Sequence, residues 1–421
     1  MDLTSPGPTL GVVGGGQLGR MLAEAAAPLG AEVVALDPTP DPPAAPVSRA
    51  TIESDFDDPE GMDALAARAD CLTYEIELAD PDLLERVGED AGVPVHPAPE
   101  TLRTIQDKLV QKRRLREAGV SVPAFRAIES AADLEGALDE LGCPAMLKAR
   151  RGGYDGRGNV PVESPADAEA ALGAIEGPAM VEEMVDFERE LSVIGINGAG
   201  EVATFAPSEN VHREEILRET VVPARTSERV RERARAVARE VLDLLSGRGT
   251  FGIELFEVGE ARSASGSSSG RRPREGGEIL VNEIAPRPHN SGHWTIEGAL
   301  TSQFEQHARA VLGWPLGATA RRGPTAIANV LGDTDEPRPA ALSGIESALA
   351  APGVSLHWYG KREARPLRKM GHLTAVGDRE RAADDAGTDG SGTGPETGAE
   401  LLARVRELRD GLTFAAAGGD P

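Results

Sequence analysis

Short apolar runs alternate with amphipathic stretches through the first hundred residues of the chain. Alternation of this kind is typical of buried parallel strands joined by helices. The pattern therefore predicts an N-terminal βα domain. The predicted strands are 9–13, 31–36, 70–74 and 93–96, and the predicted helices are 17–29 and 58–69.

The rest of the chain mixes helical and strand patterns less regularly and ends in a β-rich segment from about residue 323. This order indicates a mixed α/β and α+β protein. At 421 residues, two or three domains with substantial cores are expected. The predicted helices are 100–118, 131–141, 165–175, 225–245, 301–312 and 400–410, and the predicted strands are 145–147, 179–185, 190–196, 249–258 and 278–284.

Two segments have the composition of flexible connections. Residues 259–277 are rich in Gly and Ser and separate two predicted strands, so they are expected to be an insertion in a hairpin. Residues 378–399 are rich in Asp, Gly, Ser and Thr, and are expected to be a disordered acidic linker.

A glycine turn follows the first predicted strand. Gly14, Gly16 and Gly19 fit the Gly-x-Gly-x-x-Gly pattern, and Asp37 ends the second strand about 20 residues later. Such a turn places backbone N–H groups toward a phosphate, and the acidic residue can bind a ribose. A nicotinamide-dependent dehydrogenase is therefore one hypothesis, although folds that bind other nucleotides begin in the same way.

A second glycine-rich segment follows Lys148 and contains two arginines and a tyrosine. Glycine lets backbone N–H groups turn toward an anion, and the flanking cations add charge. The segment lacks the Gly-Lys-Ser/Thr ending of a Walker loop. Residues 147–159 therefore predict a phosphate-covering loop, with a solvated hairpin tip as the alternative.

Carboxylates recur inside or at the ends of predicted strands. Glu75 and Glu77 follow a parallel strand, where open α/β sheets bind ligands, although both could be surface acids. Glu182 and Glu183 lie in a buried run and need partners. Removal of residues 259–277 leaves a hairpin that puts Glu254 beside Glu283, with Asn282 adjacent. Like charges directly opposite repel each other, and hard oxygen ligands suit Mg²⁺, so this pair predicts a magnesium site.

Two further segments are dense in donors. Residues 285–294 contain Arg287, His289, Asn290 and His293, and residues 361–369 contain three arginines and two lysines. A basic cluster of this kind, in a chain with a formal net charge of −25, predicts anion binding.

The charge balance excludes a nucleic-acid binder, which needs a basic surface. Only five lysines occur, Lys108 and Lys112 among them on one face of a predicted helix. An acidic, lysine-poor composition suggests adaptation to high salt, where screening makes self-repulsion small. Cys71 and Cys143 lie in apolar segments and are expected to be buried thiols. With no signal peptide or apolar run of ~20 residues, a cytoplasmic protein without a membrane span is expected.

Together, these motifs resemble the ATP-grasp superfamily and, within it, the N5-carboxyaminoimidazole ribonucleotide synthase family. The resemblance covers nearly the whole chain and depends most on Gly-Gly-Tyr-Asp-Gly-Arg-Gly after Lys148 and on Asn-Glu-Ile-Ala-Pro-Arg-Pro-His-Asn-Ser-Gly-His-Trp-Thr from Asn282. It implies a Rossmann-like domain over 1–98, an ATP-grasp domain over 99–318 with a mobile lid at about 123–187, and a small β-rich domain over 319–415. A homodimer is also implied.

The resemblance also assigns residues to ligands, and some residues serve two of them. The implied catalytic residues are Asp155, Arg287, His289, Asn290, Lys361 and Arg368. The implied ATP ligands are Lys108, Lys148, Gly153, Tyr154, Asp155, Gly156, Arg157, Gly158, Asn159, Glu182, Glu183, Met184, Val185, Glu190, His212, Asn282 and Glu283. The implied ligands of the ribonucleotide are Gln17, Glu75, Tyr154, Arg157, Lys361 and Arg368, and those of Mg²⁺ are Glu254 and Glu283.

The implied reaction is ATP- and bicarbonate-dependent carboxylation of 5-aminoimidazole ribonucleotide through carboxyphosphate. Phosphoryl transfer needs mainly positioning and charge neutralisation. Asp155 is the candidate acceptor of the proton released from the amine. A formate-using glycinamide ribonucleotide transformylase would share the ATP site and remains the alternative, and a nucleotide sensor without turnover is a third hypothesis.

Overall fold

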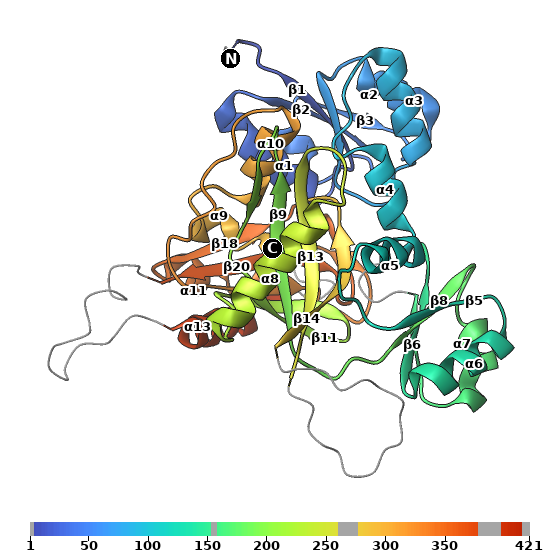
Figure 1. Ribbon diagram of the computed structural model, residues 1–421. Helices are drawn as coiled ribbons and strands as arrows, with labels where there is room; N and C mark the ends of the chain where they lie inside the picture. Colours follow the sequence, from blue (N-terminus) through green and yellow to red (C-terminus); the bar gives the residue numbers. More distant parts are fainter. Residues whose placement is uncertain (1–3, 153–157, 260–276, 378–396, 415–421) are drawn as a thin grey trace, which may run out of the picture.

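The computed structural model describes residues 4–152, 158–259, 277–377 and 397–414. The expected loop residues Gly153, Tyr154, Asp155, Gly156 and Arg157 lie outside this part of the chain, as do most of the two predicted flexible segments. Figure 1 shows the N-terminal strands at the top, a long sheet in the middle and a small lobe beside it at lower right.

The N-terminal sheet has four parallel strands in the order β3-β2-β1-β4. Helices cover both of its faces, which explains why β1, β2 and β4 are almost entirely buried, whereas the edge strand β3 alternates between partly buried and exposed residues. The strands are β1 (Thr9–Val13), β2 (Glu32–Asp37), β3 (Ala50–Glu53) and β4 (Cys71–Tyr74), and the helices are α1 (Gln17–Ala26), η1 (Ala27–Leu29), α2 (Pro59–Ala66) and α3 (Pro81–Ala91).

The strand predicted over 93–96 is wrong. Only one bridge joins this segment to the sheet, between Leu72 and Val95. Pro94 and Pro97 have no N–H to donate, so a ladder cannot extend in either direction. The short strand β3 and helix α3 were not predicted.

The helix predicted over 100–118 is two helices, α4 (Pro99–Gln106) and α5 (Lys108–Glu117). They are separated by Asp107, whose backbone is extended (φ −105°, ψ 102°) and whose carboxylate accepts hydrogen bonds from the N–H groups of Leu109 and Val110. Asp107 is therefore an N-cap inside what reads as one helical pattern.

The small lobe is a four-stranded antiparallel sheet, in the order β5-β8-β6-β7, with helices packed on one face. Its last strand ends at Glu183, so Met184 and Val185 follow the strand and are not part of it. The lobe consists of β5 (Phe125–Ile128), α6 (Ala131–Leu141), β6 (Ala145–Ala149), β7 (Asn159–Val162), η3 (Pro165–Asp167), α7 (Ala168–Gly173) and β8 (Ala179–Glu183).

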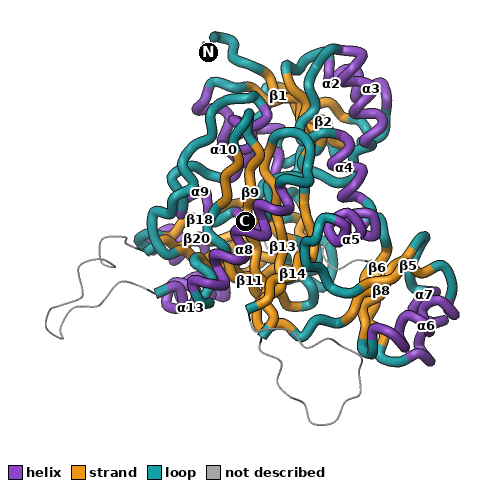
Figure 2. The backbone as a smooth tube through the Cα atoms, in the orientation of Figure 1, coloured by secondary structure: helices purple, strands orange, loops and turns teal. Residues whose placement is uncertain are grey.

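The central sheet is antiparallel and runs β14-β13-β9-β11-β12-β15-β20-β18, with β10 paired to β9. Figure 2 shows its strands in orange through the middle of the molecule. Helix α8 packs on β9, β13 and β14, whereas α13 packs on β12, β15 and β20. The strands are β9 (Phe187–Asn197), β10 (Val202–Thr204), β11 (Ser208–Arg213), β12 (Ile216–Val222), β13 (Gly249–Val258), β14 (Glu278–Ala285), β15 (Thr325–Leu331), β18 (Val354–Trp358) and β20 (Lys369–Val376). The helices around it are α8 (Glu228–Leu242), η4 (Asn290–Gly292), α9 (Thr295–Gly298), α10 (Gln303–Val311), α11 (Ile345–Ala350) and α13 (Gly398–Asp410).

The predicted β-rich C-terminal segment shares this sheet, because β15 pairs directly with β12. Two short ribbons complete the segment. They are β16 (Arg338–Pro339) with β19 (Glu363–Ala364), and β17 (Leu342–Ser343) with β21 (Thr413–Phe414). The domain boundaries near residues 98 and 318 stay predictions.

Two smaller expectations are wrong. Gly398 and Ala399 belong to α13 and not to a linker, because Thr397 and Glu400 form a capping box at its start. Cys71 is buried but Cys143 is exposed, in the short connection between α6 and β6. Within the described ranges, no helix is long and apolar enough to cross a membrane.

Candidate active site

The glycine turn after β1 is held by two carboxylates from neighbouring strands. The Gly15 N–H donates to Asp37 Oδ2 at 2.8 Å, and the Gly16 N–H donates to Glu75 Oε1 at 2.6 Å. Gly14 has a φ of +107°, and a Cβ there would lie 2.6 Å from Glu75 Cγ. Asp37 therefore stabilises the turn itself, which gives the dinucleotide-like pattern a structural explanation.

Glu75 and Glu77 have different surroundings. Glu75 is buried, and burial raises its pKa to about 7, although Arg287 and the Gly16 N–H oppose this. Glu77 is partly exposed and forms an ion pair with Arg287, whose Nε is 2.9 Å from Glu77 Oε1. Arg287 thus joins the segment after β14 to the end of β4.

Glu254 and Glu283 lie directly opposite each other on β13 and β14, as the hairpin argument predicted. The register shifts after Glu254, so Asn282 has no partner in the ladder, and its buried Oδ1 has no hydrogen-bond partner. Burial raises the pKa of Glu254; His212 opposes this and Glu283 adds to it. At Glu283, Lys108 and Lys148 outweigh burial and lower the pKa.

Three lysines from two regions of the chain pair with the carboxylates of Glu182 and Glu283. Lys148 on β6 donates to Glu182 Oε2 at 2.7 Å, and Lys108 at the start of α5 is paired with Glu283. One turn along α5, Lys112 is 2.9 Å from Glu182 Oε1. The structure thus brings the predicted phosphate-binding lysines together with the predicted nucleotide- and metal-binding glutamates.

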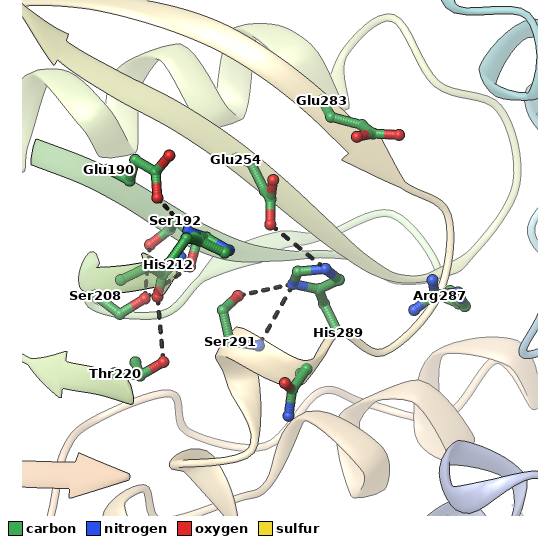
Figure 3. A network of polar contacts seen from close by, with 12 residues as sticks. Glu190, Ser192, Ser208, His212, Thr220, Glu254, Glu283, Arg287, His289 and Ser291 are labelled. Carbon is green, nitrogen blue, oxygen red and sulfur yellow. Dashed lines mark hydrogen bonds and ion pairs between the residues drawn. The ribbon is translucent and has the colours of Figure 1, made fainter. Parts of the chain in front are cut away.

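Two histidines lie on the same side of the sheet (Figure 3). His212 Nδ1 is hydrogen-bonded to Glu190, and His289 Nε2 is 3.6 Å from Glu254 Oε1. The other ring nitrogen of His289 is 2.9 Å from Ser291 Oγ. Burial lowers the pKa of His289 well below its ordinary value, so this ring is neutral.

Asn290 lies beside these groups, but Asn329 engages its side chain. Asn329 Nδ2 donates to Asn290 Oδ1 at 2.7 Å, and Asn290 Nδ2 donates to Asn329 Oδ1 at 3.2 Å. Asn329 also donates to the Leu217 carbonyl at 2.8 Å. In this arrangement Asn290 links η4 to β12 and β15.

The basic segment 361–369 lies against the N-terminal region. Arg362 Nη2 is 3.1 Å from Asp41 Oδ2, and a Cβ added at Gly360 would lie 2.7 Å from Arg20 Nη1. Within the segment, Lys361 donates to the Lys369 carbonyl at 2.7 Å, and Arg368 donates to the Glu363 carbonyl at 2.9 Å. Lys361 and Arg368 therefore come from a part of the chain that adjoins the turn of Gln17.

The two ends of the glycine-rich loop are described. The Gly158 carbonyl accepts from the Ala149 N–H at 2.7 Å, and Asn159 donates to Glu215 Oε2 at 2.9 Å, which joins the lobe to the β11–β12 turn. At the other side of the lobe, Glu183 accepts from the Ala124 N–H at 2.8 Å. The loop ends are thus placed near the central sheet.

The sequence did not identify three residues that contact this site: Lys112, Ser291 and Asn329. Lys112 carried a signal, because lysine is scarce and this lysine lies four residues after Lys108. Ser291 lies inside the donor-dense segment 285–294, two residues after its partner His289, but nothing in the segment distinguished it from its neighbours. Asn329 carried no signal, since its contacts with Asn290 and with the Leu217 carbonyl join distant segments.

Family models match three consecutive parts of the chain. A ribonucleotide synthetase preATP-grasp domain matches residues 8–106, and an ATP-grasp domain matches residues 113–304. A phosphoribosylaminoimidazole carboxylase C-terminal domain matches residues 325–386.

Two relatives of known name match over most of their length. An N5-carboxyaminoimidazole ribonucleotide synthase of Brucella melitensis is 41% identical over 385 residues, covering 90% of this chain and 99% of that protein. The protein of the same name from Bacillus subtilis is 37% identical, covering 88% and 91%.

Two solved structures are also similar to this chain over most of their length. The N5-carboxyaminoimidazole ribonucleotide synthetase of Thermotoga maritima superposes with a TM-score of 0.81 at 37% identity, covering 97% of this chain and 99% of that one. An Aspergillus clavatus N5-carboxyaminoimidazole synthase, in complex with ADP and 5-aminoimidazole ribonucleotide, superposes with a TM-score of 0.76 at 34% identity, covering 88% and 94%.

Proposed function

The chain belongs to the N5-carboxyaminoimidazole ribonucleotide synthase family of ATP-grasp ligases, and we propose which of its residues carry out the ATP- and bicarbonate-dependent carboxylation of 5-aminoimidazole ribonucleotide. The observation that carries this assignment is the pair Glu254 and Glu283, directly opposite each other between two lysines and the Arg287–His289 segment. The product belongs to purine biosynthesis.

ATP would lie between the lobe and the central sheet. Lys108 and Lys148 would exchange their present carboxylate partners for phosphate oxygens, which likewise accept charge-assisted hydrogen bonds. Residues 182–185 would bind the adenine, and Glu190 with His212 would flank the ribose. The ADP complex of the Aspergillus clavatus protein supports a nucleotide at such a site.

Magnesium fits the donor set beside the phosphates. Glu254, Glu283 and the unpaired Oδ1 of Asn282 are hard oxygen ligands on neighbouring strand positions. Mg²⁺ in nucleotide sites commonly takes one or two carboxylates together with substrate phosphates. When bound there, the ion would neutralise charge on the phosphate groups.

Bicarbonate would lie between the phosphates and the segment after β14. Arg287 has a planar fork of donors that matches a carboxylate-like anion. Neutral His289, held by Ser291, has its Nε2 on the side of Glu254 and could donate to a second oxygen. Asn290 would complete this side of the site through its link to Asn329.

The aminoimidazole ribonucleotide would lie between the N-terminal turn and the basic segment 361–369. Gln17 and Glu75 would contact it from one side, and Lys361 and Arg368 from the other. The remaining expected ligands, Tyr154 and Arg157, lie outside the described residues.

The reaction then has two steps. A bicarbonate oxygen attacks the γ-phosphorus of ATP, the bond to the β-phosphate oxygen breaks, and ADP and carboxyphosphate form. The exocyclic amine next attacks the carboxyl carbon of carboxyphosphate, phosphate leaves, and the amine loses a proton. Asp155, the candidate acceptor of that proton, lies outside the described residues.

The experiment that tests this function is ADP release in molar KCl from Mg-ATP and bicarbonate, with and without aminoimidazole ribonucleotide. Strong stimulation by the ribonucleotide is expected. If the folded protein binds ATP but the ribonucleotide has no effect, the substrate assignment is wrong, and glycinamide ribonucleotide with formate is the next pair to test.

We also propose that the protein is a homodimer in the cytoplasm, as the family resemblance implies. Light scattering at several protein concentrations would test the oligomeric state, since a dimer would give twice the chain mass of 44.1 kDa.

A further inference from the structure

Lys112 is a buried cation with two partners on different elements. Its side chain is 3% exposed, its Nζ is 2.9 Å from Glu182 Oε1, and it donates to the Val281 carbonyl at 3.1 Å. Glu182 is on β8 of the lobe and Val281 is on β14 of the central sheet. The one ammonium group therefore ties both to α5.

Glu182 has a second cation, Lys148, which differs from Lys112 in access. The side chain of Lys148 is 15% exposed, as is that of Lys108, whereas Lys112 and Glu182 are each 3% exposed. Lys148 and Lys108 thus have room to turn toward a ligand. Lys112 is held in the interior by the carboxylate and the carbonyl together.

The pKa values of Glu182 and Lys112 agree with a buried ion pair between them. Burial favours the neutral form of Glu182, yet Lys112 and Lys148 outweigh it and lower its pKa to about 2. Burial lowers the pKa of Lys112 to about 8 against the opposing effect of Glu182. A buried carboxylate deprived of both cations would be strongly destabilised.

We propose that Lys112 is a positioning residue of the nucleotide site: it is the permanent counter-ion of Glu182 and thereby releases Lys148 for the phosphates of ATP. Without Lys112, movement of Lys148 to a phosphate would leave Glu182 buried and unpaired, so Lys148 would stay on Glu182. The inference rests on the proposed function only in that Lys148 binds phosphate.

The test is the affinity for ADP, measured by titration calorimetry on the full chain. Lys112→Met is expected to weaken ADP binding at least about tenfold, because one phosphate contact is lost or must be made at the cost of an unpaired charge. Lys112→Arg, which keeps the charge, should restore most of the affinity. Arg113→Met, an exposed neighbour on α5, is the matched control and should leave binding within about twofold of the wild type.

Repeating the substitution in a Glu182→Gln protein separates a positioning role of Lys112 from a general contribution of Lys112 to stability. With Glu182→Gln there is no carboxylate to neutralise, so adding Lys112→Met should change ADP affinity less than about threefold. An equal loss in both backgrounds would overturn the proposal, as would wild-type affinity in the single variant. If Lys112→Met alone does not fold, the Glu182→Gln background decides, and a double variant that also fails to fold would overturn the proposal.

The outcome for the proposed function is read separately. A wild-type chain that binds no ADP would contradict the nucleotide site itself. A wild-type chain that binds ADP while Lys112→Met binds equally well would contradict only the role of Lys112.

Discussion

Glu283 lies opposite Glu254 and its charge is balanced by Lys108, and all three residues would contact Mg-ATP. Glu283→Gln keeps the shape of the side chain and removes the charge. We expect the rate of ADP formation to fall about a hundredfold or more, because charge neutralisation is the main contribution to phosphoryl transfer.

The rate is measured by coupled ADP release at saturating Mg-ATP and bicarbonate. Glu278→Gln, at the far end of the same strand, is the control and should retain activity. A Glu283→Gln enzyme with more than a tenth of the wild-type rate (~10%) would contradict the metal role.

Arg368 comes from the basic segment near the N-terminal turn, away from the paired glutamates. Arg368→Ala should reduce carboxylation of the ribonucleotide about 10- to 100-fold while leaving bicarbonate-dependent ATPase activity within about threefold. Both activities are measured on the same preparation. Arg362→Ala, which removes a largely exposed arginine of the same segment, is the comparison; equal loss of both activities in Arg368→Ala would refute this division of roles.

Glu75 makes stability depend on pH in a direction that its surroundings define. Burial raises its pKa from 4.5 in the unfolded chain to about 7 in the fold, so the native state holds the proton more tightly. Its contribution to stability is therefore complete below about pH 4.5 and is lost as the pH rises to about 7.

Glu75→Gln keeps an acceptor for the Gly16 N–H and removes this titration. The wild type should lose stability between pH 5 and pH 8 and the variant should not. The free energy of unfolding of the variant minus that of the wild type should therefore increase by about 1–3 kcal/mol from pH 5 to pH 8. Urea denaturation at both pH values measures it. A difference between the two proteins that does not change with pH would show that Glu75 does not titrate in this range.

At the scale of elements, the break between α4 and α5 positions the lobe. Asp107 caps α5 and also pairs with Arg150 at the end of β6, where Arg150 Nε donates to Asp107 Oδ1 at 3.0 Å. The Lys108 N–H donates to the Arg150 carbonyl at 2.9 Å. One carboxylate thus serves a helix end and the start of the glycine-rich loop.

Asp107→Ala should therefore cost more than a helix cap alone, about 2–4 kcal/mol in free energy of unfolding, and should raise KM for ATP. Asp107→Asn should retain the cap of α5 but only part of the interaction with Arg150. Ser227→Ala, which removes the cap of α8, is the matched control and should cost about 1 kcal/mol with KM unchanged. Equal costs for Asp107→Ala and Ser227→Ala in urea denaturation would argue against the second role.

At the scale of the whole molecule, a net charge of −25 acts on every part of the surface. The Debye length falls from about 10 Å at 0.1 M salt to about 3 Å at 1 M, so screening should remove most of the self-repulsion over this range. We expect Tm to rise with KCl, most steeply below about 0.5 M. Sucrose at matched osmolality, which stabilises by exclusion without screening, is the control. A Tm that responds equally to both would contradict the electrostatic explanation.

Residues that are close in sequence produced the most accurate expectations. Periodicity predicted β1, β2, β13, β14 and most helices, because burial on one or both faces imposes a local pattern. The pairing of Glu254 with Glu283 was also correct, since a hairpin register depends on adjacent strands. The family resemblance was confirmed by the relatives, and it carried the activity.

The expectations that were wrong have local as well as distant causes. Asp107 caps α5 through the nearby N–H groups of Leu109 and Val110 and also pairs with Arg150, which follows β6. The segment 93–96 has a strand-like composition, but its own prolines prevent a ladder. The joining of β15 to β12 depends on which edges of two sheets remain unpaired after folding.

The sequence by itself therefore determined most of the elements, because these follow from local patterns of burial, and it contained the motifs whose resemblance to a known family implied the reaction. Only the tertiary structure decided how the charged groups are paired: that Asp37 holds the glycine turn, that Asn329 engages Asn290, and that Lys112 and Lys148 share Glu182. The physical reason is that ionic partners are selected by distance and burial, and both are properties of the folded chain rather than of positions along it.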